Sequence, residues 1–206
     1  MSKAKKIIEM LEKQINNFSD FVQVEMRTEF EIMELDEDKQ SYLIKEKTDD
    51  GWCQLVSDEE IEVVYNEDKI FKVSNSNGFN FIPIDGDNGL MTIIETIGKK
   101  LSRCDCVFFD EQIFCFLEFK FNVKIDAKPR AIKKNPRDAI GQLEATIDKF
   151  DELLEKDYQD LNLEAYVCLP PVYPKNNAHW RGLVRKFDDK YQYRIKLLRT
   201  NEKICQ

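Results

Sequence analysis

Histidine is nearly absent from this chain, since His179 is the only one among 206 residues. A zinc site built on two histidines is therefore excluded. A serine or cysteine nucleophile activated by histidine would have to use His179, which lies in a polar segment with no local signature of such a site. The sequence also has no glycine-rich P-loop and no dinucleotide fingerprint, so nucleotide-driven chemistry is not indicated.

Long apolar runs are missing as well. No segment reaches the roughly 18 consecutive apolar residues of a membrane helix. Residues 1–18 lack the apolar stretch and cleavage site of a signal peptide. We therefore expect a cytoplasmic protein that makes no membrane contact. The six cysteines form no CxxC pair, and we interpret them as buried free thiols.

What the chain does have is a hydrophobic fraction of 42% with fourteen phenylalanines, enough for one well-packed domain with an extension. Its net charge of −8 is unevenly divided. Residues 1–98 contain 10 basic and 22 acidic residues, whereas residues 99–206 contain 21 and 17. The basic surplus lies in the second half. The acidic first half is either a solvated surface or a surface for a protein partner.

The hydrophobic pattern predicts an N-terminal helix over residues 1–18, followed by a β-rich segment and then by mixed helices and strands. In the β-rich segment we expect strands at 21–26, 29–35, 41–46, 61–66 and 69–74. From residue 89 onward we expect a helix at 89–102, strands at 104–109 and 113–123, a basic loop at 124–136, a helix at 137–156, and strands at 164–170 and 191–199. We divide the chain into a helix with a β-rich extension, 1–88, and a core, 89–206.

The segment DGDNG at 85–89 invites comparison with a calcium loop. The twelfth position of such a loop would be Thr96 instead of glutamate. We therefore interpret residues 85–89 as a turn that precedes the helix at 89–102.

One short motif stands out by its surroundings. An acidic residue, any residue and a lysine occur in that order five times, about as often as chance predicts. Only Glu118 and Lys120 lie in an apolar strand, IFCFLEFKF, where buried charges need compensation. Because side chains alternate along a strand, both point to the same face. Asp105 interrupts the preceding apolar strand in the same way.

These three residues predict a metal site. A tight hairpin would bring Asp105 beside Glu118, and two carboxylates are suitable ligands for Mg²⁺ or Mn²⁺. Such an ion polarises a phosphate and lowers the pKa of an attacking water, while Lys120 can orient that water and stabilise developing charge. The alternative is a structural ion pair buried in the sheet.

At this point the chain resembles the PD-(D/E)XK superfamily, the restriction-endonuclease-like nucleases. Their core runs helix, strand with aspartate, strand with (D/E)xK, helix, strand, and residues 89–170 follow that order. Cys104 occupies the place of the motif's proline. The resemblance covers about 40% of the chain and leaves residues 19–88 unexplained.

The resemblance implies roles for individual residues. Asp105, Glu118 and the backbone carbonyl of Phe119 would bind the metal, and Lys120 would be catalytic. Glu95 on the helix at 89–102 and Gln142 on the helix at 137–156 would support them. For each of these two, the alternative is an ordinary helix residue exposed to solvent.

Basic and aromatic residues near the motif suggest contacts to nucleic acid. The basic set that follows the motif strand could neutralise phosphates, or could be solvated loop charges. Its members are Lys124, Lys128, Arg130, Lys133, Lys134 and Arg137. Tyr173, Trp180 and Arg181 lie in a segment expected to be a loop, where they either stack on bases or pack against the protein.

The sequence thus predicts an α/β protein. Its expected fold is a restriction-endonuclease-like core with a mixed central sheet flanked by helices, plus the N-terminal helix and β-rich extension. The expected function is Mg²⁺-dependent hydrolysis of phosphodiester bonds, in DNA rather than RNA. A catalytically inactive relative that binds protein or nucleic acid is the alternative. Cutting both strands of a duplex would need two paired active sites, so the sequence leaves open whether the protein forms a homodimer.

Overall fold

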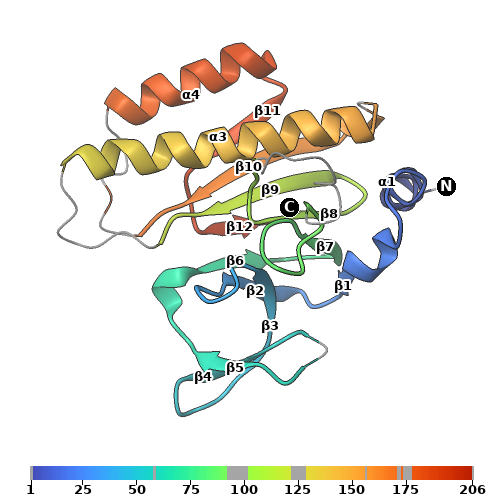
Figure 1. The fold of residues 1–206 in the computed structure, drawn as a ribbon, viewed down its shortest axis with the longest axis vertical. Helices are drawn as coiled ribbons and strands as arrows, with labels where there is room; N and C mark the ends of the chain where they lie inside the picture. Colours follow the sequence, from blue (N-terminus) through green and yellow to red (C-terminus); the bar gives the residue numbers. More distant parts are fainter. Residues whose placement is uncertain are drawn as a thin grey trace.

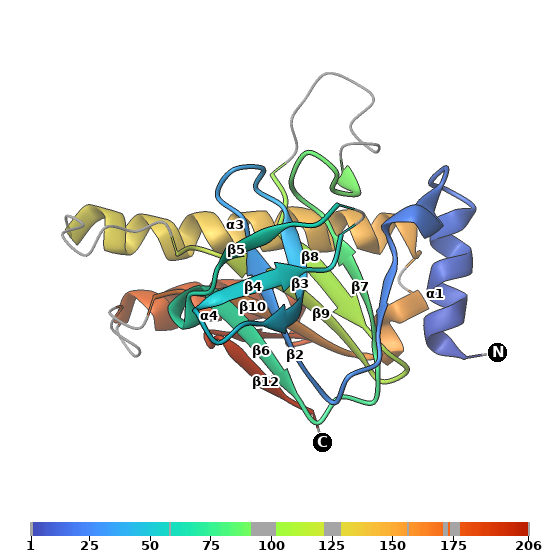
Figure 2. The same ribbon diagram turned by 90° about the horizontal axis from the view of Figure 1, so that it is seen from below.

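The computed structural model describes residues 2–57, 59–91, 102–121, 129–155, 157–170, 173 and 178–205. These residues form three layers (Figure 1). Helices α3 (Pro129–Leu153) and α4 (Ala178–Tyr191) cover one face of a six-stranded sheet, and a second six-stranded sheet covers the other face. Figure 2 shows the second sheet in front of the first, with α3 behind both.

The first sheet has the strand order β1-β7-β8-β9-β10-β11. Neighbouring strands are antiparallel from β1 to β9, whereas β9, β10 and β11 run parallel to one another. The strands are β1 (Gln23–Glu25), β7 (Phe79–Pro83), β8 (Cys106–Phe109), β9 (Ile113–Phe119), β10 (Asn162–Cys168) and β11 (Ile195–Leu198).

The second sheet has the order β12-β6-β2-β3-β4-β5. It is antiparallel except for the pair of β12 and β6. Its strands are β2 (Glu29–Glu34), β3 (Ser41–Lys47), β4 (Trp52–Leu55), β5 (Glu62–Val64), β6 (Ile70–Ser74) and β12 (Glu202–Ile204).

Each sheet takes strands from both sides of residue 88. Strands β1 and β7 of the first half join the first sheet, and β12 from the end of the chain joins the second sheet. The division expected at 88/89 therefore does not coincide with a break between sheets. The two sheets share one apolar layer, in which the ring of Phe108 lies 6.0 Å from that of Phe71 and 5.3 Å from that of Phe79.

Alternation along β9 shows why the sequence forms this central strand. Phe114 and Phe116 pack into the core beneath the helices, whereas Cys115 and Leu117 pack between the two sheets. A strand buried on both faces needs apolar residues at every position. Glu118, the sixth residue of β9, is the exception to that pattern.

The helices differ from expectation at their ends. Helix α1 (Lys3–Glu12) is shorter than the predicted 1–18, and the chain after it turns, with Asn17 in the left-handed region at a φ of 57°. Short 3-10 segments follow at Phe18–Phe21, Glu67–Lys69 and Asp157–Asp160. Helix α3 begins at Pro129, so part of the expected basic loop at 124–136 is helical. Proline is well suited to the first turn of a helix, and α3 also includes Pro136.

The segment expected to be a loop before the last strand contains helix α4. Its apolar positions Trp180, Val184, Phe187 and Tyr191 recur at three- and four-residue spacing, which is typical of a helix packed on one side. Strand β11 is correspondingly shorter than the strand predicted at 191–199. Strands β4, β7 and β12 had not been expected either.

The structure confirms a mixed α/β protein with two mixed sheets and, among the described residues, three α-helices. Most of the helix expected at 89–102 lies outside the described residues. In the part of the chain that the structure describes, no helix combines the length and apolarity needed to cross a membrane.

We predict that the two sheets unfold together. Replacing Phe108 by alanine removes a ring from the layer between them and should lower the free energy of unfolding by about 3–5 kcal/mol. Denaturant unfolding followed by fluorescence and by circular dichroism should give one shared, shifted transition. Val64→Ala on β5, where the side chain is 62% exposed, should change stability by about 0.5 kcal/mol or less. Two separate transitions would show that the sheets are independent units.

Candidate functional site

The register of β8 and β9 brings the two motif carboxylates together. Cys106 pairs with Leu117, and the N–H of Asp105 donates to the carbonyl of Leu117 at 3.0 Å, so Asp105 lies opposite Glu118. Residues opposite one another in an antiparallel pair project to the same face. That face is the one beneath the helices, since Val107 and Phe116, the neighbours two residues along, pack there.

Lys120 completes this group, which we call the carboxylate site: Asp105, Glu118 and Lys120. The ammonium group of Lys120 forms an ion pair with Oε1 of Glu118. The N–H of Phe119 donates to Oδ2 of Asp105. The Lys120 N–H donates to the carbonyl of Cys168 on β10 at 2.9 Å, which anchors the chain just beyond the end of β9.

Helix α3 holds the backbone that leads into Asp105. The side-chain amide of Gln142 donates to the carbonyl of Arg103 at 2.8 Å. One turn further along α3, the hydroxyl of Thr146 accepts the N–H of Cys104 at 2.8 Å. Both bonds form immediately before Asp105, so Gln142 acts as a positioning residue for this strand.

A cavity of about 370 Å³ opens onto the carboxylate site and reveals two acids that the sequence analysis missed. Glu34 reaches it from β2 of the second sheet, and Asp85 from the turn after β7. Nothing in the local sequence marks Glu34, because polar residues alternate normally along its strand, and Asp85 had been assigned only to a turn. Six of the lining residues are Glu34, Asp85, Asp105, Lys120, Asn135 and Gln142.

Burial dominates the electrostatics of the site. It raises the pKa of Glu118 well above its usual value, and the nearby charge of Asp105 adds to the rise while Lys120 opposes it. Burial also raises the pKa of Asp105, with Glu34 adding to the rise and the Phe119 N–H opposing it. The pKa of Glu34 is raised to about 6, again mainly by burial. Among the described residues, four acidic groups therefore surround the site, Glu34, Asp85, Asp105 and Glu118, against three basic ones: Lys120, Lys39, which also lines the cavity, and Arg103, which forms an ion pair with Asp85.

The donor set fits a hard divalent cation. The Glu118 side chain is fully enclosed by protein, yet its Oε2 has no hydrogen-bond partner among the described residues. A buried oxygen without a partner is costly, and a bound cation would satisfy it. Asp105, Glu118 and the carbonyl of Phe119 offer only oxygen atoms, the ligands that Mg²⁺ prefers. Within the described residues, no three His, Cys, Asp or Glu side chains converge on one metal position.

The predicted nucleic-acid contacts are only partly covered by the structure. Glu95, Lys124 and Lys128 lie outside the described residues. Arg130 and Lys133 fall in the first turns of α3, where the backbone alone is described. The side chains of Lys134 and Arg137 are exposed, and the first of them forms a 3.8 Å ion pair with Asp138.

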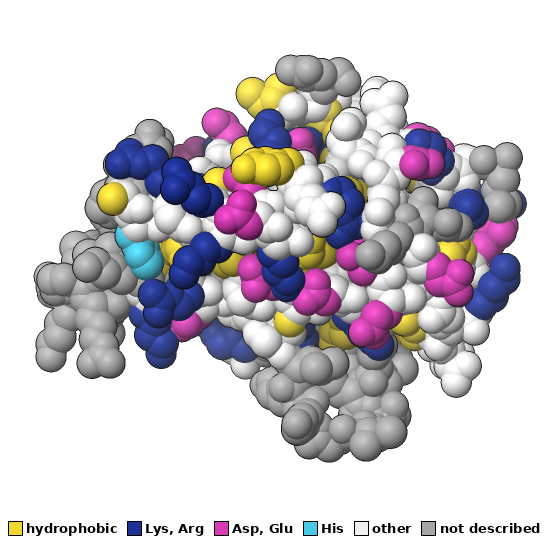
Figure 3. Space-filling model, turned by 90° about the horizontal axis from the view of Figure 1, so that it is seen from above, with side chains coloured by type: hydrophobic (Ala, Val, Ile, Leu, Met, Phe, Trp, Pro, Cys, Tyr) yellow, Lys and Arg dark blue, Asp and Glu magenta, His cyan; other side chains and the backbone are white. Residues whose placement is uncertain are grey.

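The helix layer carries further basic side chains. Figure 3 shows Lys and Arg gathered around the single histidine on this face. Arg181, Arg185 and Lys186 of α4 are all exposed. Tyr173 and Trp180, in contrast, are buried in the core beneath the helices, so packing is the correct interpretation of these two rings.

Comparison with known proteins identifies no relative: no family model, no curated protein and no solved structure matches the chain. The geometry of the carboxylate site and the motif that its residues form are therefore what points to a function.

We predict that Asp105 destabilises the metal-free protein at neutral pH. Folding raises the pKa of the Asp105 carboxyl above its usual value of 3.8, so the folded state keeps its proton to a higher pH than the unfolded state does. The free energy of unfolding therefore falls as the pH rises above 3.8. In EDTA at pH 8, Asp105→Asn should therefore be more stable than wild type, by about 1.4 kcal/mol for each unit by which folding raises the pKa of Asp105. Denaturant titrations at pH 8 and pH 4.5 measure this gap, which should narrow at the lower pH.

The exposed Asp189 of α4 supplies the matched control, and Asp189→Asn should leave stability nearly unchanged at both pH values. A less stable Asp105→Asn protein at pH 8 would mean that the folded state prefers the ionised carboxylate, contrary to the burial argument.

Proposed function

We propose that the protein is a divalent-metal-dependent nuclease that hydrolyses phosphodiester bonds, in DNA more readily than in RNA, on a restriction-endonuclease-like core. One observation carries the proposal. Asp105, Glu118 and Lys120 meet on one face of a buried sheet, where Oε2 of Glu118 lacks a partner among the described residues.

Each residue of the site has a definable task. Asp105, Glu118 and the carbonyl of Phe119 would hold Mg²⁺ or Mn²⁺, which supplies Lewis acidity toward a phosphate oxygen and a lowered pKa for bound water. Lys120 holds a positive charge beside Glu118 and is suited to orient the attacking water and to stabilise charge on the phosphate. Gln142 keeps Asp105 in register through the Arg103 carbonyl.

Substrate would approach along the helix layer. Lys134 and Arg137 of α3 are exposed in the half of the helix that also carries Asn135 and Gln142, two residues of the site cavity. Phosphate contacts by such side chains position a nucleic acid without reading its sequence. This arrangement supports a nucleic-acid substrate over a small phosphodiester.

A catalytically inactive binding module is the second candidate. The observation that favours it is the ion pair of Lys120 with Glu118, which partly neutralises the buried carboxylate without a metal. In that case nucleic acid would bind and stay intact. The two candidates differ in cleavage and in metal binding.

Removing the charge of Lys120 or of Glu118 should slow DNA cleavage severely. We predict that Lys120→Met and Glu118→Gln each lower the rate of DNA cleavage in Mg²⁺ by about 10²–10⁴-fold, because each loses a group that acts on the reacting phosphate or its metal. The measurement is a time course on labelled single-stranded and duplex DNA. Lys69→Met, in another Glu-x-Lys copy whose half-buried lysine is paired with Asp36, should cut like wild type. Equal cleavage by Lys120→Met would refute the mechanism.

Metal should stabilise the folded protein. At about 100 times its dissociation constant, Mn²⁺ contributes about 2.7 kcal/mol, which should raise the melting temperature by about 5–10 °C relative to EDTA. The Asp105→Asn variant should lose this shift, whereas Asp189→Asn should keep it. An equal shift in all three proteins would assign the metal to another place.

A further inference from the structure

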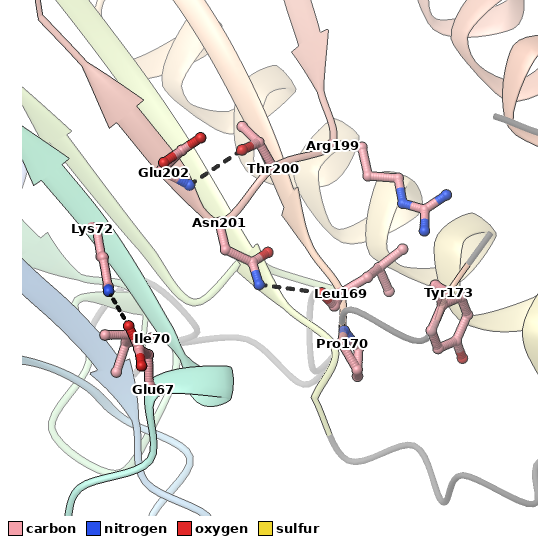
Figure 4. Close-up of a pocket in the computed structure, with 10 residues that line it drawn as sticks. All are labelled: Glu67, Ile70, Lys72, Leu169, Pro170, Tyr173, Arg199, Thr200, Asn201 and Glu202. Atoms are coloured by element: carbon pink, nitrogen blue, oxygen red, sulfur yellow. Dashed lines mark hydrogen bonds and ion pairs between the residues drawn. The ribbon is translucent and has the colours of Figure 1, made fainter. Parts of the chain in front are cut away.

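A second cavity, which we call the edge cavity, lies at the carboxyl ends of the parallel strands β10 and β11 (Figure 4). Its volume of about 330 Å³ is within the range of small-molecule sites. Arg199 and Tyr173 form one side, Glu67 and Lys72 form the other, and Leu169 lies between them. Neither the motif nor the proposed catalytic chemistry uses any of these residues.

The edge cavity and the carboxylate site lie along one edge of the first sheet. Lys120 follows β9 and donates its N–H to Cys168 of β10, and Leu169 is the next residue of that chain. On the far side, the amide of Asn201 donates to the carbonyl of Leu169 at 3.2 Å. Two strand spacings separate Lys120 from Asn201, about 10 Å. Ligands of open α/β sheets bind at this carboxyl edge.

That separation spans a few nucleotides of a nucleic-acid strand. At the rise of about 3.4 Å per nucleotide of a stacked strand, about 10 Å corresponds to about three nucleotides, and a more extended strand covers it with fewer. A strand with its scissile phosphate at the carboxylate site would therefore pass over the edge cavity two or three nucleotides away.

The lining of the edge cavity favours a base over a phosphate. The positive charges of Arg199 and Lys72 are matched by the carboxylates of Glu67 and Glu202, and Lys72 is paired with Glu67 at 2.6 Å. A pocket without surplus positive charge is a poor anion site. Apolar groups of Leu169 and its neighbours alternate with hydrogen-bonding groups, a mixture that suits the faces and edges of a nucleobase.

Arg199 provides a flat surface in this cavity. Its guanidinium lies 5.9 Å from the ring centre of Tyr173 and 5.8 Å from that of Trp180. Both buried rings lie beside the guanidinium and limit the space in which it can move, and guanidinium planes stack on exposed bases in nucleic-acid complexes. Tyr173 and Trp180, the rings expected from the sequence to stack on bases or to pack, thus contribute to base stacking only by supporting Arg199.

We propose that the edge cavity binds one nucleobase of the substrate strand, two or three nucleotides from the cleaved bond, by stacking against Arg199. This inference rests on the proposed nuclease function and deepens it, because it assigns a strand with unpaired, accessible bases as the substrate at this edge. Base recognition by stacking tolerates all four bases, so it selects for single-stranded character rather than for sequence.

The test is an abasic scan. End-labelled single-stranded DNA oligonucleotides of one sequence, each with one abasic residue at a different position, are cut in Mn²⁺ and the fragments are separated on a gel. Wild type should cut about tenfold less at bonds two or three nucleotides to one side of the abasic residue, because one stacked base is lost. The phosphate backbone is intact in every substrate, so only a base contact produces this local minimum.

Two substitutions at Arg199 separate stacking from charge. Both Arg199→Ala and Arg199→Lys should remove the minimum, since lysine restores the charge without the plane. Lys196→Ala, which removes an exposed charge on β11 three residues before Arg199 and outside the edge cavity, should keep the minimum. Arg199→Lys also retains the aliphatic stem, so it reports on the cavity should Arg199→Ala fail to fold.

The outcomes distinguish the two proposals. A full ladder of fragments without a minimum in wild type overturns the base site and leaves the nuclease function standing. A minimum that persists in Arg199→Lys also overturns stacking on Arg199. No fragments from any single-stranded oligonucleotide, in Mn²⁺ or Mg²⁺, overturn the base site, and the nuclease function is overturned as well if labelled duplex DNA also stays intact.

Discussion

The burial of two carboxylates opposite one another on β8 and β9 is the constraint on which the rest of the site depends. Asp105 is 3% exposed and Glu118 is fully enclosed, and burial raises the pKa of both. Apolar residues would have stabilised these strands better. The surrounding structure compensates with Lys120, with the N–H of Phe119 and with two hydrogen bonds from α3 to the chain before Asp105.

This compensation is incomplete in a way that matters for function. One oxygen of Glu118 has no partner among the described residues, and Glu34 and Asp85 bring further carboxyl groups to the cavity, of which Asp85 is paired with Arg103. Buried carboxylates that outnumber their basic partners are a stable arrangement when a cation or a proton joins them. The same arrangement repels anions until the carboxylates have been neutralised.

The second sheet is more than an extension. It covers the face of the first sheet opposite the helices, carries Glu34 to the site cavity, and forms the far wall of the edge cavity through Glu67 and Lys72. Sequence analysis had left residues 19–88 without a role, because their strands follow an ordinary amphipathic alternation. Their contribution arises from packing of the two sheets, which brings residues far apart in the chain to one edge.

Local pattern by itself determined the mixed α/β class, most strands of both sheets, the long helix α3, and the grouping of Glu118 with Lys120, because side-chain alternation depends only on neighbouring residues. It failed where proline hid the start of α3 and where polar residues concealed the apolar face of α4. Tertiary structure decided that Asp105 lies opposite Glu118, that Glu34 and Asp85 join them, and that Arg199 rests on two buried rings. These contacts join segments that lie far apart in the chain. They depend on the register of the strands and on the packing of the layers, and neither has a signature within a single stretch of sequence.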